Sequence, residues 1–162
     1  MERDIVEIIP HLFISNWFTS NNKNIIKEYN IKAVITVETY PKPNDILRYY
    51  NENNIDFAYI NLEDSPNANI YKFFDTSYDF INSHIKNKKN VLVHCYAGIS
   101  RSATLIINYL CRNLYTYNNL SNENPINILN YCVNFAKNKR SIINPNIGFL
   151  QQLKRKVIEY NR

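Results

Sequence analysis

The segment from Val91 to Leu110, VLVHCYAGISRSATLIINYL, constrains the fold of this chain more than any other. An apolar run ends in a His-Cys pair, a short turn contains Gly98, and a second, longer apolar run follows Arg101. A short apolar run before a turn is typical of a strand buried on both faces, whereas the longer run has the length of a helix. The segment therefore predicts a buried strand, a tight turn and a central helix, in that order.

The rest of the chain alternates short β-rich runs with segments of helical periodicity. We expect two strands broken at Pro10 within residues 5–16, and further strands over residues 31–38, 56–63 and 90–94. We expect helices over residues 20–30 (capped near Ser20), 43–54, 70–86, 101–114, 124–139 and 144–160, the last two starting at Pro125 and Pro145.

This order of elements predicts the fold class. Strands alternate with helices early and helices accumulate late, which indicates an α/β domain with a mostly parallel central sheet flanked by helices on both faces. The length of 162 residues fits one domain over residues 1–162. Trp17 and the many tyrosines are expected in the core or at its edge.

The net charge of +5 favours anionic partners, but the basic residues form only three short clusters. These clusters lie at residues 86–89, 137–140 and 154–156. Clusters this short are typical of solvated helix ends, so nucleic acid is not an expected partner. No apolar stretch is long enough to cross a membrane, and we expect no membrane association.

Three cysteines, Cys95, Cys111 and Cys132, form no paired motif, which favours a reducing compartment. We therefore expect a cytoplasmic protein, with the nucleus and a virion left open. Cys111 and Cys132 fall in apolar helical stretches, where core packing is favoured over a redox partnership with Cys95. His11 and His84 show no ligand spacing, so we expect neither a metal nor another cofactor.

The turn between the predicted strand and helix has the features of a phosphate-binding site. A helix N-terminus presents free backbone N–H groups, and Gly98 lets the backbone curl without a Cβ in the way. Arg101 can give two parallel hydrogen bonds to a phosphate. The same dipoles and charge favour the thiolate of Cys95. We infer that Arg101 binds an anion which Cys95 attacks; the alternative is that Cys95 is a small buried hydrophobe.

The stretch HCYAGISRS, residues 94–102, resembles the signature of cysteine-dependent protein phosphatases in its dual-specificity form, His-Cys-x5-Arg-Ser/Thr. The stretches IIPHLFISN and RSIINPNIGFLQQL resemble the opening strands and the closing helix segment of those domains. Small single-domain members, poxviral ones included, are the closest in size. Ser15 and Ser141 depart from the family pattern, in which a glycine and a proline are usual, and this puts the local turn geometry in doubt.

The resemblance implies a two-step reaction through a cysteinyl phosphate. Cys95 would attack the phosphate ester, while Arg101 and the loop amides stabilise the transition state. Ser102 matches the family hydroxyl that hydrogen-bonds the cysteine sulfur. His94 orients the loop or is a satisfied core residue, and Asn146 organises a loop or starts a helix. The substrate-binding loop would comprise Tyr96, Ala97, Gly98, Ile99, Ser100 and Arg101.

The leaving group needs a proton, and the loop INLEDSPNAN, residues 60–69, offers carboxylic acids. Asp64 matches the family position of the general acid, and Glu63 is its neighbour. A purely structural role for Asp64 would be to cap the following helix. The same carboxylate would activate water in the second step.

Three activities are compatible with such a site. The chain could be a protein phosphatase acting on phosphotyrosine and phosphoserine/threonine, a related phosphatase acting on RNA 5′-triphosphates or phosphoinositides, or a phosphoprotein-binding module without turnover. The variable loop residues Tyr96, Ala97 and Ile99 are neutral, unlike the loops of lipid-directed and RNA-directed relatives. We therefore expect a dual-specificity protein phosphatase whose partners are phosphorylated proteins, as a monomer or a homodimer.

Overall fold

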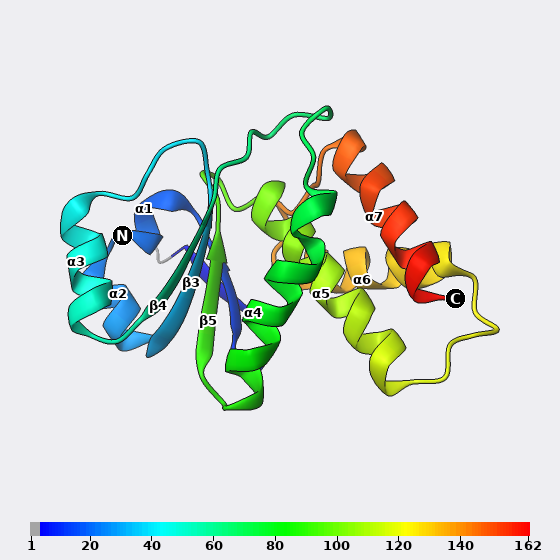
Figure 1. Ribbon diagram of the computed structural model, residues 1–162, viewed down its shortest axis with the longest axis horizontal. Coiled ribbons are helices and arrows are strands. Elements are labelled where there is room, and N and C mark those ends of the chain that lie inside the picture. Colours follow the sequence, from blue (N-terminus) through cyan, green and yellow to red (C-terminus); the bar gives the residue numbers. More distant parts are fainter. Residues whose placement is uncertain (1–3) are drawn as a thin grey trace.

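A five-stranded sheet with the order β1-β2-β5-β3-β4 forms the centre of the fold (Figure 1). The computed structural model describes residues 4–162 of the chain. β1 pairs antiparallel with β2, and all other neighbouring strands pair parallel, which confirms the predicted mostly parallel sheet. The strands are β1 (Ile5–Ile9), β2 (Leu12–Ser15), β3 (Ile31–Val37), β4 (Asp56–Ile60) and β5 (Asn90–His94).

Helices cover both faces of this sheet, as the sequence predicts (Figure 1). One face carries α1 (Trp17–Ser20), α2 (Lys23–Glu28) and α3 (Asn44–Glu52). The other face carries the short 3-10 helix η1 (Tyr71–Phe73), α4 (Phe74–Lys86), α5 (Arg101–Tyr117), α6 (Pro125–Lys139) and α7 (Ile147–Tyr160). Each layer of helices buries its own hydrophobic cluster against the sheet.

β5 connects the two hydrophobic clusters. Val91 and Val93 pack into the larger cluster, and Leu92 packs into the smaller one, because side chains alternate between the faces of a strand. α5 is buried over its first eleven residues, from Arg101 to Cys111. The turn from β5 to α5 thus joins two buried elements at the carboxyl edge of a parallel sheet, the edge at which α/β proteins bind their ligands.

Several boundaries differ from those predicted. The helix expected over residues 20–30 is shorter: α2 begins at Lys23, because the side chain of Asn22 caps it, and Ser20 is instead the last residue of α1. β3 and β4 end at Val37 and Ile60, earlier than predicted. The polar residues that follow these two strands therefore lie outside the ladder, on the same edge of the sheet as the turn after β5.

The start of α7 is a second correction. This helix begins at Ile147 rather than at Pro145, since Asn146 is its N-cap and accepts a hydrogen bond from the Phe149 N–H at 2.8 Å. Pro125 occupies the first turn of α6, as predicted. The difference matters because Asn146 precedes the helix, and its side chain contacts the loop after β4.

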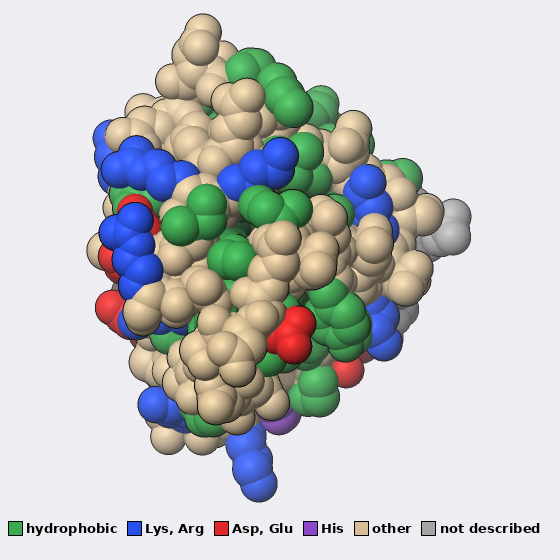
Figure 2. All heavy atoms as spheres, turned by 90° about the vertical axis from the view of Figure 1, so that its right-hand side faces the viewer, with side chains coloured by type: hydrophobic (Ala, Val, Ile, Leu, Met, Phe, Trp, Pro, Cys, Tyr) green, Lys and Arg blue, Asp and Glu red, His purple; other side chains and the backbone are tan. Residues whose placement is uncertain are grey.

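Figure 2 shows the side of the molecule that lies on the right in Figure 1, where α6 and α7 are found. Hydrophobic side chains reach the surface in several places there, with lysines and arginines distributed around them. Across residues 4–162, no helix combines the length and the hydrophobicity needed to cross a bilayer.

Candidate active site

The loop from Cys95 to Ser100 curls at the N-terminus of α5, directly after β5. Gly98 adopts a φ of +68°, a left-handed conformation that favours glycine. A Cβ atom at this position would lie 2.6 Å from the carbonyl oxygen of Ser15. The close approach of β2 to the loop therefore requires a glycine at position 98.

Cys95 and Ser102 lie together at the base of the loop. Both side chains are buried, with Cys95 only 2% exposed, and the Sγ–Oγ distance is 3.2 Å. A hydroxyl at this distance can donate a hydrogen bond to a thiolate, which stabilises the charged form of the sulfur. The structure thus brings together the two residues that the sequence assigns to nucleophile and sulfur partner.

Arg101 is the first residue of α5, and its guanidinium is fixed by two other segments. Nη1 donates to Oε1 of Glu38 at 2.9 Å and to the carbonyl oxygen of Leu62 at 3.0 Å. Nε of Arg101 is buried and has no hydrogen-bond partner within the described part of the chain. A buried donor of this kind is expected to find an acceptor in the working state, and a bound oxyanion can provide one.

Glu38 was not identified from the sequence. It follows β3 immediately, it is 2% exposed, and it forms a buried ion pair with Arg101. The available signal was a carboxylate directly after a buried strand, which parallel pairing places at the same sheet edge as the turn after β5.

His94 is a buried, neutral histidine beneath the loop. Burial, and after it the nearby charge of Lys42, lowers the pKa of His94 well below 6.5. Nδ1 lies 3.0 Å from the Cys95 carbonyl oxygen. Because that oxygen can only accept, Nδ1 carries the proton and donates a hydrogen bond to it. Nε2 accepts from the Thr36 hydroxyl at 2.7 Å. The two alternatives from the sequence therefore coincide, because a satisfied core histidine also orients the loop.

Asp64 and Asn146 are brought together from opposite halves of the chain. Asp64 is exposed on the loop after β4, and its Oδ1 accepts a hydrogen bond from Asn146 Nδ2 at 2.9 Å. The N–H of Asn146 also donates to the Ser100 hydroxyl at 3.0 Å. Asn146 therefore links the loop after β4 to the loop between β5 and α5. Asp64 does not cap the following helix, because the N-cap of η1 is Ile70 and has no side-chain bond.

The start of α7 also contacts the rest of the loop that follows β4. A Cβ atom at Gly148 would overlap the carbonyl group of Pro66, so the helix backbone and the loop are in direct contact. Gln152 donates to the Ala68 carbonyl and accepts from the Tyr71 N–H, both at 2.9 Å. The closing motif of the sequence is thus the structural support of the loop that carries Asp64.

Arg140 corrects a prediction made from charge patterning. The sequence suggests a solvated helix end at residues 137–140, but Arg140 is 5% exposed. Its Nε donates to the Gly98 carbonyl at 2.9 Å, its Nη2 donates to the Ala97 carbonyl at 3.1 Å, and Asp4 balances its charge. Lys156, in the cluster at residues 154–156, is likewise buried and pairs with Asp75.

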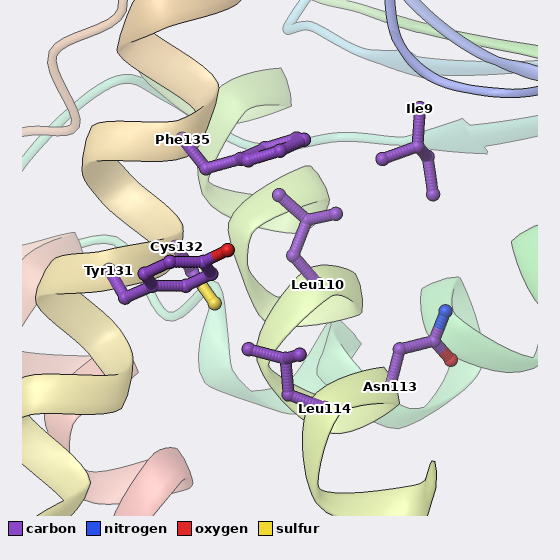
Figure 3. A pocket seen from close by; sticks show the side chains of 7 residues that line it. All are labelled: Ile9, Leu110, Asn113, Leu114, Tyr131, Cys132 and Phe135. Carbon is purple, nitrogen blue, oxygen red and sulfur yellow. The ribbon is translucent and has the colours of Figure 1, made fainter. Parts of the chain in front are cut away.

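Cys111 and Cys132 lie in the core, as predicted, on α5 and α6. A hydrogen bond with Cys132, together with burial, raises the pKa of the Cys111 thiol, so these two thiols adjoin each other. Cys132 also borders a hollow of about 220 Å³ between α5 and α6 (Figure 3). That hollow has no carboxylate, histidine, lysine or arginine in its lining, which consists of Ile9, Leu110, Asn113, Leu114, Tyr131, Cys132 and Phe135.

Known proteins resemble this chain in both sequence and fold. The dual specificity phosphatase catalytic domain matches residues 12–159. Protein 123R of Invertebrate iridescent virus 6, whose name assigns it to the tyrosine phosphatases, is 35% identical over 144 residues, which cover 89% of each chain. Dual specificity protein phosphatase 1 of Homo sapiens is 36% identical over 149 residues, covering 91% of this chain but only 36% of the human protein.

Solved structures agree with this assignment. The crystal structure of DUSP15 superimposes with a TM-score of 0.81 at 25% sequence identity, covering 99% of this chain and 92% of the other. The matched region contains β2 to α7, and with them the loop after β5, the loop after β4 and the start of α7. The chain therefore belongs to the dual specificity phosphatase family.

Proposed function

We propose that this chain hydrolyses phosphotyrosine and phosphoserine/threonine in proteins, with Cys95 as the nucleophile. The observation that carries the proposal is the convergence at one loop of a buried cysteine with a hydroxyl partner, an arginine whose buried Nε has no partner among residues 4–162, and an exposed carboxyl group on an anchored loop. A nucleophile, an oxyanion donor and a general acid are the three groups that this displacement needs.

In the first step the Cys95 thiolate attacks phosphorus, so that an S–P bond forms while the P–O bond to the substrate breaks. Arg101 and the loop amides at the N-terminus of α5 stabilise the negative charge on the three equatorial oxygens. The departing alkoxide or phenoxide takes its proton from the carboxylic acid of Asp64. Asn146 holds that carboxyl group through its Nδ2 donor.

In the second step a water molecule attacks the cysteinyl phosphate. The carboxylate of Asp64 accepts a proton from the water, a P–O bond forms, and the S–P bond breaks to release inorganic phosphate. The sulfur leaves as a thiolate, and the Ser102 hydroxyl eases its departure by donating a hydrogen bond to it. His94 keeps the loop in place through the Cys95 carbonyl and takes no proton during the cycle.

Protein substrates are preferred over lipid headgroups and RNA ends because of the charges around the loop. The loop residues Tyr96 and Ile99 are neutral, and Glu63 on the adjacent loop is an exposed carboxylate. A polyphosphorylated ligand would require exposed cations at these places. The binding-module alternative is disfavoured because the nucleophile, the arginine and the acid are all present.

The reaction also bears on localisation and on the role of the whole chain. Because a catalytic thiolate is lost on oxidation, we place the protein in a reducing compartment, with the cytoplasm preferred. Its partners are phosphorylated proteins, and residues 1–162 act as one catalytic domain. The chain spans about a third of the human relative but most of the viral one, so these assignments concern the catalytic domain.

The experiment that tests the proposal is capture of the cysteinyl phosphate. Wild-type protein mixed with a phosphotyrosine peptide and quenched in acid should carry one phosphoryl group on the peptide fragment that contains Cys95, as measured by mass spectrometry. Cys95→Ser should carry none there and should lose turnover, while vanadate still protects it against thermal unfolding. Turnover by Cys95→Ser within about tenfold of wild type would remove Cys95 from the mechanism.

A further inference from the structure

Exposed large hydrophobic side chains lie near the loop between β5 and α5, residues 95–100, which we call the phosphate-binding loop. Tyr96, on the loop itself, is 48% exposed, and its ring meets that of Phe18 edge to face with centroids 5.8 Å apart. Tyr40 lies on the same flank, Ile142 lies on the segment between α6 and α7, and Ile147 is the first residue of α7; all three are about half exposed or more. We call these five residues, Phe18, Tyr40, Tyr96, Ile142 and Ile147, the apolar rim.

Backbone hydrogen bonds hold both flanks of this rim against the loop. On one flank the Trp17 N–H donates to the Tyr96 carbonyl at 2.8 Å, and the Trp17 ring contacts Tyr40 with centroids 6.2 Å apart. On the other flank the Asn144 N–H donates to the Ile99 carbonyl at 2.8 Å. The backbone segments on both flanks are therefore attached to the phosphate-binding loop in the absence of substrate. This lowers the entropic cost of ordering the rim when a substrate binds.

The charges near the rim do not suit an acidic partner. The cations that contact this region are buried, with exposed fractions of 8% for Arg101, 5% for Arg140 and 3% for Lys42. Glu63, the neighbour of Asp64 on the loop after β4, is an exposed carboxylate, and it repels acidic side chains beside the phosphate. Exposed apolar side chains next to a reaction site, edged by negative charge, are typical of an interface for apolar side chains.

We infer that the apolar rim selects phosphorylated protein segments carrying a large apolar residue two positions from the phosphorylated one. The inference rests on the proposed phosphatase function and adds its substrate preference. In an extended segment alternate side chains share a face, so residues two positions away point the same way as the phosphorylated side chain. With the phosphate in the loop, those side chains meet Phe18 and Tyr96 on one flank or Ile142 and Ile147 on the other.

The experiment compares matched phosphotyrosine peptides that differ only at the two positions two residues from phosphotyrosine. These positions carry leucine, serine or glutamate, and the small substrate 4-nitrophenyl phosphate is measured beside them. Burying a leucine against the rim should raise kcat/KM about tenfold over the serine peptide. The glutamate peptide should fall below the serine peptide because of repulsion by Glu63.

Phe18→Ala tests the rim itself, and Tyr117→Ala is the matched control. Phe18 and Tyr117 are each 66% exposed, but Tyr117 lies at the far end of α5. Phe18→Ala should reduce the leucine-to-serine ratio of kcat/KM to below about threefold. Tyr117→Ala should retain the wild-type ratio.

Two results would overturn this inference while the proposed function stands. Wild-type protein that hydrolyses 4-nitrophenyl phosphate but treats the leucine and serine peptides equally has no apolar preference. A wild-type dimer that Phe18→Ala dissociates, measured by sedimentation, would show that a second copy occupies the rim. If wild-type protein hydrolyses neither 4-nitrophenyl phosphate nor any peptide, the proposed function fails, and the inference fails with it.

Discussion

The guanidinium of Arg101 donates to the carboxylate of Glu38 at 2.9 Å, and both side chains are buried. The pair joins the first residue of α5 to the residue that follows β3, so two neighbouring parallel strands, β3 and β5, set its geometry. Because Glu38 neutralises Arg101 before an anion binds, it keeps a buried guanidinium from being left without a counter-charge. It also fixes the direction in which Nε points.

Glu38→Gln should lower the free energy of unfolding and increase the stabilisation that a bound oxyanion provides. Loss of one partner of a buried ion pair costs about 3–5 kcal/mol of unfolding free energy. A bound vanadate would then supply the missing negative charge, so vanadate should raise the Tm of Glu38→Gln more than that of wild type. Glu63→Gln, at an exposed acid on the neighbouring loop, is the control. Equal Tm shifts in Glu38→Gln and wild type would show that Glu38 does not balance Arg101.

Asp64→Asn should slow substrates in proportion to the basicity of their leaving groups. Phosphotyrosine and phosphoserine peptides should lose about 10²–10⁴ in the rate of phosphoenzyme formation, and an activated aryl phosphate should lose less. Wild type should also lose rate as the acid deprotonates with rising pH, whereas the variant should not. Glu63→Asn should change little. A leaving-group-dependent loss in Glu63→Asn alone would move the acid by one residue, and its absence in both would place the acid outside this loop.

Asn146→Ser separates the two roles of Asn146. Serine is also a good N-cap, so the Tm should change little, but the donor to Asp64 is lost. Turnover of phosphotyrosine peptides should fall about tenfold, with a smaller effect on an activated aryl phosphate, because positioning of the acid is impaired. Asn146→Ala removes the cap as well and should also lower the unfolding free energy by about 1 kcal/mol. Wild-type peptide turnover by Asn146→Ser would mean that this hydrogen bond is dispensable.

Arg140→Lys should loosen the phosphate-binding loop. A lysine cannot bridge the Gly98 and Ala97 carbonyls and Asp4 at once, since these contacts use the planar geometry of the guanidinium. The inhibition constant for vanadate should rise about tenfold, a loss of roughly one charge-assisted hydrogen bond. Arg155→Lys, at an exposed arginine of α7, should leave it unchanged. An unchanged constant for Arg140→Lys would reduce Arg140 to a packing role.

The buried His94 should make stability depend on pH. Burial and the neighbouring charges of Lys42 and Arg101 keep its folded-state pKa well below 6.5, while the unfolded chain binds a proton near 6.5. The unfolded state therefore holds more protons below that pH, and stability present at pH 7 is lost as the pH falls. Urea unfolding should show a slope of up to about 1.4 kcal/mol per pH unit between pH 6.5 and 5.5 from this residue.

His94→Asn should flatten that slope, although it also removes the bonds to Thr36 and the Cys95 carbonyl. His11→Asn is the matched control, because His11 has a φ of +73° that asparagine tolerates and lies at the opposite end of β2. The slope of His11→Asn is measured over the same interval, beside those of wild type and His94→Asn. The same slope in His94→Asn and wild type would assign the titration to another group.

Local features of the sequence predicted the strand, turn and helix that form β5, the loop after it and α5. The apolar run of β5, the glycine at position 98 and the apolar face of α5 act within about twenty residues, so periodicity and turn chemistry suffice to define them. The assignment of Asp64 needed more than local chemistry, since two adjacent acids lie on that loop. The boundary errors at Pro145 and in residues 20–30 arose where an asparagine cap, at Asn146 and Asn22, overrode the expected helix start.

By itself, the sequence determined an α/β chain with a cysteine and an arginine around one helix N-terminus, because strand and helix periods and the Cys-x5-Arg spacing are properties of short segments. Only the tertiary structure decided which distant groups complete the site. Glu38 reaches Arg101 because β3 lies beside β5, and Asn146 reaches Asp64 because the start of α7 packs against the loop after β4. Such pairs depend on sheet order and helix packing, which no single segment encodes, and they decide the direction of Arg101 and the position of the acid.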